Sequence, residues 1–202
     1  MQRINLQKSN LNPNFIGSWM METLSLCDDL IDYFESHEGR QSRGSTGKGV
    51  NLDTKVSTDI TIAPNEINSP GNEVFQDYFN GLFDCHKDYF AQWPFLENFA
   101  EGAMNLEIGR FNLQRYHSGE HFQELHTERF SLSTLHRVFA WMTYLNDVDE
   151  GGSTYFNHYD IEVQPKRGLT LIWPAEWTHA HMGNVVKAGS KYIITGWMNF
   201  PG

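Results

Sequence analysis

The stretch RVFAWMTYL, residues 137–145, is a run of β-branched and aromatic residues, and several shorter runs of the same kind surround it in the second half of the chain. Such runs, separated by turn-forming residues, are typical of β-strands. The predicted strands are 111–116, 137–145, 154–156, 161–163, 169–173 and 192–197, with an alternating segment at Met104, Leu106 and Ile108. Because no helical segment lies between them, the pattern predicts an antiparallel sandwich or jelly roll with helices packed outside.

The first half of the chain is predicted to be mainly helical. Apolar residues recur at intervals of three and four over 18–37, with Ser18 as the expected N-cap, and again over about 72–93, where Pro94 ends the helix. A short strand is expected at 59–62. Between them, the glycine-rich segment 39–51 has no apolar residue before Val50, so we expect a mobile loop. Four cations lie in or just beyond this segment: Arg40, Arg43, Lys48 and Lys55.

Length and composition limit the class of protein. A chain of 202 residues suits one domain, which we divide into a helical support region at about 1–100 and a β core at about 103–200. A net charge of −10 argues against a nucleic-acid partner. No apolar run approaches the roughly 20 residues that span a bilayer, and the first residues do not resemble a signal peptide. With only Cys27 and Cys85, we expect free thiols and a cytoplasmic protein; the oligomeric state stays open.

The tripeptide His126-Thr127-Glu128 is the first candidate for chemistry. Residues at i and i+2 of an extended strand point to the same face, so one metal ion could bind both side chains. His181, on another predicted strand, is a candidate third ligand. Two imidazoles and one carboxylate on one side of a metal leave positions open, an arrangement that suits non-haem Fe(II) activating O2. Lys191 opens an apolar strand, and its ammonium could pair with a carboxylate of a bound ligand.

These residues belong to a series of ordered blocks that resembles a known family. The blocks are Arg115-Tyr116 and Gly119, His126-x-Glu128, 142–148, 150–154, 165–168, 173–181 and 189–192. Together they are similar to the 2-oxoglutarate and Fe(II)-dependent oxygenases of the prolyl 4-hydroxylase branch, a group that includes small phage and bacterial proteins. The resemblance covers about residues 104–199, and segment 57–62 resembles the strand that precedes this core. It implies a double-stranded β-helix, or jelly roll, with the N-terminal helices outside.

The resemblance also implies cofactors and site residues. Fe(II), 2-oxoglutarate and O2 would be used, with ascorbate as a candidate reductant. His126, Glu128 and His181 would bind the metal, and Lys191 would hold the distal carboxylate of 2-oxoglutarate. The remaining residues implied near the cofactors are Tyr144, Tyr116, Thr195 and Trp197.

Two of the metal-ligand assignments, His181 and Glu128, have alternatives to weigh. His179 competes with His181, but His181 lies ten residues before Lys191, as in the family, and is preferred. Glu128 stands where the family mostly has Asp; it still offers a carboxylate oxygen, whereas a small residue would have opened a halide site, so hydroxylation is preferred over halogenation. His117 and His121 are expected in a loop before the metal-binding segment.

By resemblance, the first substrate is a prolyl residue in a peptide or protein, with segment 39–56 either a lid over it or a disordered connector. A free amino acid or another small molecule is the alternative within the enzyme class. From another class, the fold could be a non-catalytic cupin-like metal-binding module or a phage structural protein. Lys191 argues against the module, because a structural metal site needs no co-substrate clamp. If the protein is phage-encoded, the expected location is the host cytoplasm.

Overall fold

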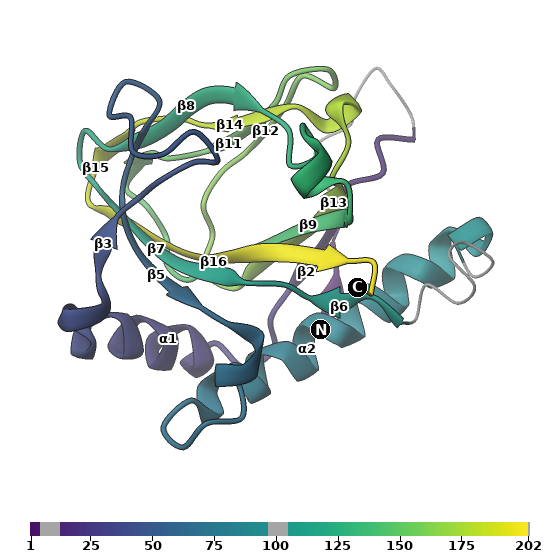
Figure 1. The fold of residues 1–202 in the computed structure, drawn as a ribbon, viewed down its shortest axis with the longest axis horizontal. Helices are drawn as coiled ribbons and strands as arrows, with labels where there is room; N and C mark the ends of the chain where they lie inside the picture. The colour runs from purple at the N-terminus through teal and green to yellow at the C-terminus, as the bar shows by residue number, and fades with distance from the viewer. Residues whose placement is uncertain (5–12, 97–104, 202) are drawn as a thin grey trace.

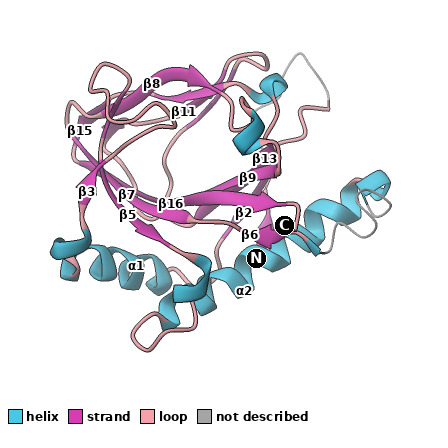
Figure 2. Cartoon of the chain, viewed as in Figure 1, coloured by secondary structure: helices cyan, strands magenta, loops and turns pink. Residues whose placement is uncertain are grey.

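Two antiparallel β-sheets face each other in the computed structural model, which describes residues 1–4, 13–96 and 105–201 (Figure 1). Helices α1 (Ser25–Ser36) and α2 (Glu73–Gln92) lie against the outer side of the larger sheet (Figure 2). Across the described residues, the order of the larger sheet is β1-β2-β13-β9-β16-β7-β5-β3, with β6 beside β16, and that of the smaller is β12-β11-β14-β8-β4. The predicted mainly β jelly roll with N-terminal helices outside is confirmed.

The strand bounds follow the predicted runs closely. The larger sheet consists of β1 (Gln2–Arg3), β2 (Gly17–Met20), β3 (Ser42–Arg43), β5 (Thr58–Ile62), β6 (Glu107–Ile108), β7 (Phe111–His117), β9 (Arg137–Tyr144), β13 (Leu169–Pro174) and β16 (Ser190–Asn199). The smaller sheet consists of β4 (Lys55–Val56), β8 (His121–His126), β11 (Thr154–Phe156), β12 (Ile161–Val163) and β14 (His181–Gly183). A separate pair joins β10 (Glu150–Gly151) to β15 (Val186–Ala188). Met104, expected in a strand, lies outside the described residues.

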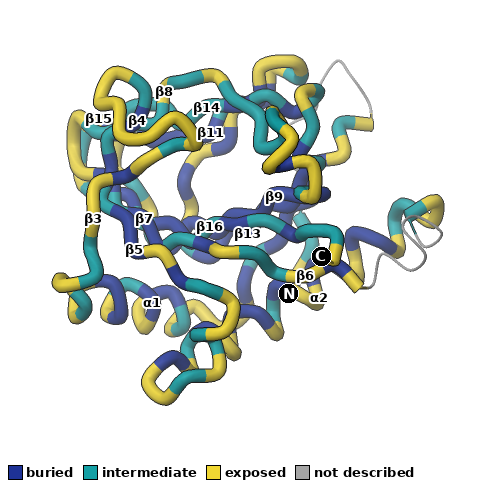
Figure 3. The backbone as a smooth tube through the Cα atoms, viewed as in Figure 1, coloured by how far each residue is buried: buried dark blue, intermediate teal, exposed yellow. Residues whose placement is uncertain are grey.

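Alternation along β9 divides the apolar interior into two layers. Trp141 points to the helices, where it packs with Tyr78 and Phe111, whereas Met142 packs with Leu171 in the layer between the sheets. Successive side chains of a strand leave opposite faces, so one strand serves both layers. Buried residues accordingly run along the central strands, and exposed residues gather in the loops (Figure 3). The helices thus support the outer face of the sheet and leave its inner face for the site.

The predicted helix at 18–37 is wrong at its start. Residues 17–20 form strand β2 on the edge of β13, with Trp19 opposite Thr170, and the helix begins at Ser25 after an uncapped Leu24. Ser18 is therefore not an N-cap. The Trp19 ring is buried against Tyr89 of α2. The spacing of apolar residues at three and four favours a helix here, but this local preference is weak. Pairing with the edge of the sheet and burial of the Trp19 indole outweigh it, and both depend on tertiary structure.

The expectation of an unburied loop at 39–51 is wrong in part. Strand β3 pairs with β5, and just beyond the loop β4 pairs with β8, so the segment runs from one sheet to the other. Gly44 is buried at the base of the loop, where a Cβ atom would lie 2.0 Å from the Ser57 hydroxyl oxygen. Only glycine fits so close to a side chain. Lys55 is also buried rather than solvated.

Other expectations have mixed outcomes. His117 and His121 were expected in a loop but end β7 and begin β8. Cys27 and Cys85 are free, as expected, and the structure shows that both are buried. Among the described helices, none combines the length and apolar character needed to cross a membrane.

Candidate functional site

A cavity of about 1040 Å³ opens between the two sheets. Its walls come from the inner faces of β5, β7, β9 and β16, from β8 and β14 of the smaller sheet, and from the loop at 42–48. Seven of the eight site residues predicted from the sequence line it: Tyr116, His126, Glu128, His181, Lys191, Thr195 and Trp197. The fold therefore gathers most of the predicted residues around one space.

His126, Glu128 and His181 converge at one place in this cavity. Their ligand-capable atoms all lie within 4.8 Å of one another. The Nε2 atom of His181 is 3.4 Å from Glu128 Oε1, and that of His126 is 3.6 Å from the same oxygen. The two histidines lie directly opposite each other in the β8–β14 pairing, and Glu128 follows just past the end of β8. These are the three side chains that could hold a metal ion in the described part of the chain.

Backbone carbonyls orient both imidazole rings. Nδ1 of His126 lies 2.8 Å from the Glu124 carbonyl oxygen, and Nδ1 of His181 lies 2.9 Å from that of His179. Since a carbonyl can only accept, each Nδ1 carries the hydrogen and each Nε2 presents its lone pair to the cavity. Two imidazole acceptors and a carboxylate oxygen then meet with no donor between them. A divalent cation satisfies such a set of acceptors, and ring orientation by an outer hydrogen bond is usual at metal-binding histidines.

The protonation states agree with this donor set. Burial, with a smaller contribution from His181, lowers the pKa of His126 to about 4. Burial alone would raise the pKa of Glu128, but the neighbouring His181 and His126 rings and the Trp197 N–H favour the ionised carboxylate and lower its pKa to about 2. At neutral pH His126 is therefore neutral and Glu128 is ionised, which are the states that bind a metal.

Arg137 and Trp197 hold the far side of Glu128. The Trp197 indole N–H donates to Glu128 Oε2 at 2.7 Å, which leaves Oε1 facing the imidazoles. Arg137 donates to the Glu128 backbone carbonyl at 3.0 Å, and its guanidinium lies 3.6 Å from the centre of the Trp197 ring. The sequence predicted Trp197 near the pocket but did not connect it with Glu128. Arg137 was missed as a contact of this residue, because its position at the start of β9 carries no local signal.

His179 is turned away from the other two histidines. Its Nε2 donates to the Asn14 carbonyl at 2.9 Å, and its Nδ1 accepts from the Thr178 hydroxyl at 3.0 Å. Both ring nitrogens are thus occupied, and burial lowers the pKa of the ring to about 4. The structure brings His181, and not His179, to His126 and Glu128.

Lys191 is buried deeper in the cavity without an acidic partner among the described residues. Its ammonium donates to the Gly152 carbonyl at 2.9 Å and lies 4.5 Å from the centre of the Tyr116 ring. Burial lowers its pKa to about 7. A lysine at the start of a strand ordinarily lies in solvent at the edge of the sheet. Lys191 does not, because only 3% of its surface is exposed. A buried cation in this state is suited to bind a carboxylate.

The predicted tyrosines lie on the two strands that flank β16, which carries this lysine: Tyr116 on β7 and Tyr144 on β9. The Tyr116 hydroxyl donates to Gln114 Oε1 at 2.8 Å. Tyr144 is fully buried and does not line the cavity itself; its hydroxyl donates at 2.6 Å to Thr154, which does. The Thr195 hydroxyl donates to the Trp141 backbone carbonyl. Sequence reasoning missed Thr154, whose short strand gave no sign of facing the site.

A second buried lysine is already neutralised. Lys55 lies 2.7 Å from Asp59, whose carboxylate also accepts from Ser57 and Gln114. Gln114 in turn accepts from Tyr116, so a polar network runs from the base of loop 42–57 to the neighbourhood of Lys191. Since Lys55 has its own carboxylate, Lys191 is the buried lysine of this cavity that is left for a ligand.

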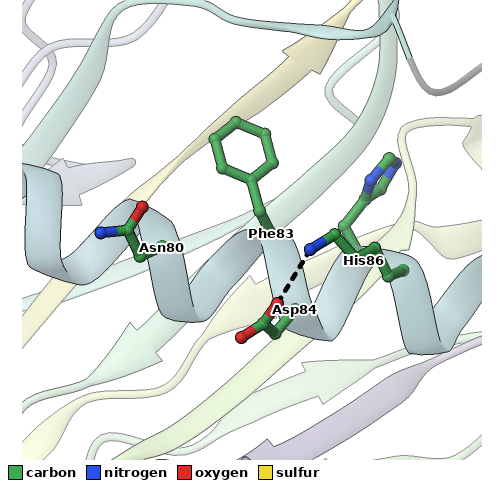
Figure 4. Close-up of a pocket in the computed structure, with 5 residues that line it drawn as sticks. Asn80, Phe83, Asp84 and His86 are labelled. Carbon is green, nitrogen blue, oxygen red and sulfur yellow. Dashed lines mark hydrogen bonds and ion pairs between the residues drawn. The ribbon is translucent and has the colours of Figure 1, made fainter.

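A smaller hollow lies on the surface of α2 (Figure 4), lined by Asn80, Phe83, Asp84, His86 and Lys87. Asp84 and Lys87 form an ion pair of 3.1 Å along the helix. This hollow lies on the helical layer, outside the two sheets. It contains one histidine and one carboxylate and lacks the three converging ligands found between the sheets, so it is not a second metal centre.

Comparison with known proteins finds a family model that matches the part of the chain carrying this arrangement. Residues 111–199 match the model of the 2OG-Fe(II) oxygenase superfamily. The matched segment covers 89 of the 202 residues, and over this segment the chain is similar to that superfamily of oxygenases. The matched residues run from β7 to the end of β16 and include all three converging side chains and Lys191.

Curated relatives are prolyl 4-hydroxylases. The chain is 28% identical over 75 residues to the human prolyl 4-hydroxylase subunit alpha-1, a match covering 34% of this chain and 14% of that protein. It is 25% identical over 114 residues to the probable prolyl 4-hydroxylase 9 of Arabidopsis thaliana, covering 44% of this chain and 40% of that protein. The matched region thus spans less than half the length of either relative.

Solved structures share the fold over almost the whole chain. A prolyl-4-hydroxylase of Pseudomonas putida superposes with a TM-score of 0.70 at 15% identity, covering 96% of both chains. A prolyl hydroxylase of Trichoplax adhaerens, solved with a hypoxia inducible factor peptide fragment, has a TM-score of 0.68 at 17% identity and covers 94% of this chain and 85% of its own. At these identities the likeness shows the fold alone.

The low pKa of Lys191 predicts how the stability of the metal-free protein depends on pH. The folded pKa of about 7 lies below the ordinary 10.5, so the unfolded chain binds more protons between these values. The free energy of unfolding should therefore rise with pH across this window, with Lys191 contributing up to about 1.4 kcal/mol per pH unit. Below the window, Lys191 should contribute no change of this free energy with pH. Urea denaturation at pH 7, 8 and 9 measures the slope.

The Lys191→Met variant should lose this part of the slope, because methionine carries no charge in either state. Lys166→Met, at an exposed position outside the cavity, is the matched control and should keep the wild-type slope. Equal slopes for wild type and Lys191→Met would contradict the assignment.

Proposed function

We propose that this protein is an Fe(II)- and 2-oxoglutarate-dependent dioxygenase that hydroxylates an unactivated C–H bond, with a prolyl residue of a peptide or protein as substrate. The observation that carries the proposal is the convergence of two imidazoles and one carboxylate within 4.8 Å, in a cavity that also contains a buried cation. We further propose that residues 1–202 act as one oxygenase domain, with the helices supporting the sheet that carries the site.

The residues present fit the metal and the oxo acid. His126, Glu128 and His181 would bind Fe(II) on one side, through two nitrogens and one oxygen, and leave its other positions free. When bound, Fe(II) with 2-oxoglutarate and O2 supplies the oxidant that inserts oxygen into a C–H bond, with succinate and CO2 as co-products. The chain would supply the three ligands and keeps Glu128 in place through Trp197 and Arg137.

Lys191 would hold the distal carboxylate of 2-oxoglutarate. A carboxylate arriving beside this ammonium stabilises its charged form and offsets the burial that lowers its pKa. Tyr116 and Thr195 line the same cavity, and Tyr144 would act through Thr154, to which its hydroxyl is bonded. The oxo acid would thus be oriented at one end by the lysine and at the other by the metal.

Aromatic side chains would exclude water and stray reductants from the metal. Phe122 stacks on the His126 ring with centroids 4.0 Å apart, and Trp173 and Phe156 lie 5.0 and 5.6 Å from the His181 ring. Phe122 and Phe156 belong to the smaller sheet and Trp173 to the larger one, so aromatic rings approach the two imidazoles from both sheets. A dry environment strengthens the electrostatic interactions inside the site.

The form of the cavity supports a peptide substrate. Its volume exceeds what 2-oxoglutarate needs, and its rim includes exposed residues such as Lys48, Phe130 and Trp177. Loop residues 42–48 line the rim, which supports a role for segment 39–56 as a lid over the substrate. Gly47 approaches Phe130 across the opening: a Cβ atom there would lie 2.8 Å from the phenyl ring. The prolyl 4-hydroxylase relatives support proline as the target.

We predict that the protein releases succinate when it is supplied with Fe(II) and 2-oxoglutarate in air. A peptide substrate that contains proline should increase the rate of succinate release. The peptide should gain the mass of one oxygen atom, measured by mass spectrometry. The same peptide with alanine in place of proline is the control. Stimulation by free amino acids alone would favour a small-molecule enzyme, and absence of succinate under all conditions would favour a non-catalytic metal-binding module.

The second prediction concerns the ligands. His126→Ala, Glu128→Ala and His181→Ala should each weaken binding of Mn(II), used in place of Fe(II), by at least about 100-fold and abolish succinate release, because each removes one ligand. His179→Ala is the control. It should retain most of the Mn(II) affinity and most of the succinate release, because the His179 ring is hydrogen-bonded to Asn14 and Thr178 and does not face the metal ligands. Calorimetric titration measures the affinity. An inactive His179→Ala with an active His181→Ala would reverse the choice of ligand.

The third prediction concerns the clamp. Lys191→Ala should raise the 2-oxoglutarate concentration needed for half-maximal succinate release by about 10- to 100-fold, since a charge-assisted bond contributes about 1.5–3 kcal/mol. Lys48→Ala, at the exposed rim, is the control for loss of a positive charge. An unchanged requirement in Lys191→Ala would assign the clamp to another cation, and Arg137 is the first to test.

A further inference from the structure

The cavity is positively charged in an acidic protein. Six lysine or arginine side chains and three carboxylates are among the described residues that line it, whereas the whole chain has a net charge of −10. Binding of a divalent metal and of doubly charged 2-oxoglutarate would leave this balance unchanged, because their charges cancel. The excess of positive charge can therefore attract a further, negatively charged ligand into the cavity.

Pairing shows which cations account for the excess. Lys48 lies 2.8 Å from Glu124, Lys55 lies 2.7 Å from Asp59, and Arg137 lies 3.6 Å from Glu128. The cations that remain are Lys191, Arg43 and Arg110. Lys191 is buried beside the proposed oxo-acid site, whereas the two arginines are exposed and lie at the rim.

Arg43 and Arg110 mark two ends of one wall. Arg43 lies opposite Thr58 at the start of β5, and Arg110 directly precedes Phe111, which lies opposite Ile62 at the end of β5. At about 3.3 Å per residue, these strand positions are about 13 Å apart. Neither arginine forms an ion pair with a described residue. Glu66, the carboxylate whose pKa Arg110 helps to lower, is already bound by Arg40 at 2.8 Å and by the Ala63 amide.

The other side of the rim is apolar. Leu125, Phe130 and Trp177 line the cavity and are 48%, 54% and 66% exposed. Large exposed apolar side chains around a cavity mark a surface that binds a partner. A ligand that fits this rim therefore presents negative charge to the β3–β5–β7 wall and apolar groups to the opposite side, over a length greater than that of a small acid.

We propose that the substrate segment is an acidic peptide, whose carboxylates pair with Arg43 and Arg110 while neighbouring apolar side chains pack on Phe130 and Trp177. This inference deepens the proposed function and rests on it, since it specifies which peptides reach the metal. The long-range attraction between such a peptide and the two unpaired arginines also increases the rate of association and weakens with added salt.

Binding of two fluorescent peptides tests the proposal without turnover. Each is a short probe with one central proline; one carries glutamates on both sides and the other carries glutamines at the same positions. Fluorescence anisotropy under anaerobic conditions, with Mn(II) and 2-oxoglutarate present and then absent, gives the affinity of the full chain for each. We expect the glutamate peptide to bind about tenfold more tightly at low ionic strength, with the difference shrinking as salt is added.

The double variant Arg43→Gln/Arg110→Gln should bind the two peptides with nearly equal affinity. Lys166→Gln removes a positive charge away from the cavity and should keep the wild-type preference. Equal affinities in the wild-type protein, or a preference that survives the double variant, would overturn the proposal. Succinate release by the wild-type protein is read separately: its presence without a preference for the acidic peptide refutes this inference alone, and its absence refutes the proposed oxygenase activity.

Discussion

The antiparallel register of β8 with β14 sets His126 directly opposite His181, and the geometry of the site depends on it. A shift of the register by one residue would turn one imidazole to the other face of the sheet. Glu128 completes the arrangement from just past the end of β8, where it is no longer bound to strand geometry and the Trp197 indole can hold one of its oxygens. Pairing of two short strands thus places three acceptors within one small space.

A polar cavity inside a sandwich of two sheets is costly, because charged groups such as Lys191 and Glu128 are removed from water. The apolar layer on the other side of the larger sheet supplies the compensating stability. There, Trp141 packs against Tyr78 and Phe79 of α2, while neighbouring residues of the same strand face the cavity. Because β9 serves both layers, the helices support the sheet that carries the cavity although they contribute no side chain to the three converging residues.

The two ends of the cavity are chemically different. The inner end contains the imidazoles, aromatic rings and an unpaired lysine, and the rim contains exposed arginines and apolar side chains. Solved prolyl hydroxylases share the fold with this chain at 15% and 17% identity. The fold therefore persists at low identity, and two arginines of this chain that form no ion pair with a described residue, Arg43 and Arg110, lie at the rim of the cavity.

The sequence alone predicted the strands of the core and the second helix, because strand and helix periodicity are local properties. The grouping of His126, Glu128, His181 and Lys191 came from the resemblance to the oxygenase family, since these residues are up to 65 positions apart. The sequence mispredicted β2 as helix and placed His117 and His121 in a loop. It also did not reveal the bonds of Glu128 to Arg137 and Trp197, the pairing of Lys55 with Asp59, or Thr154 as the partner of Tyr144. Those contacts join residues from different segments. Only the packing of the sheets decided them, since which edge is free and which charge finds a partner depends on neighbours that are distant in the chain.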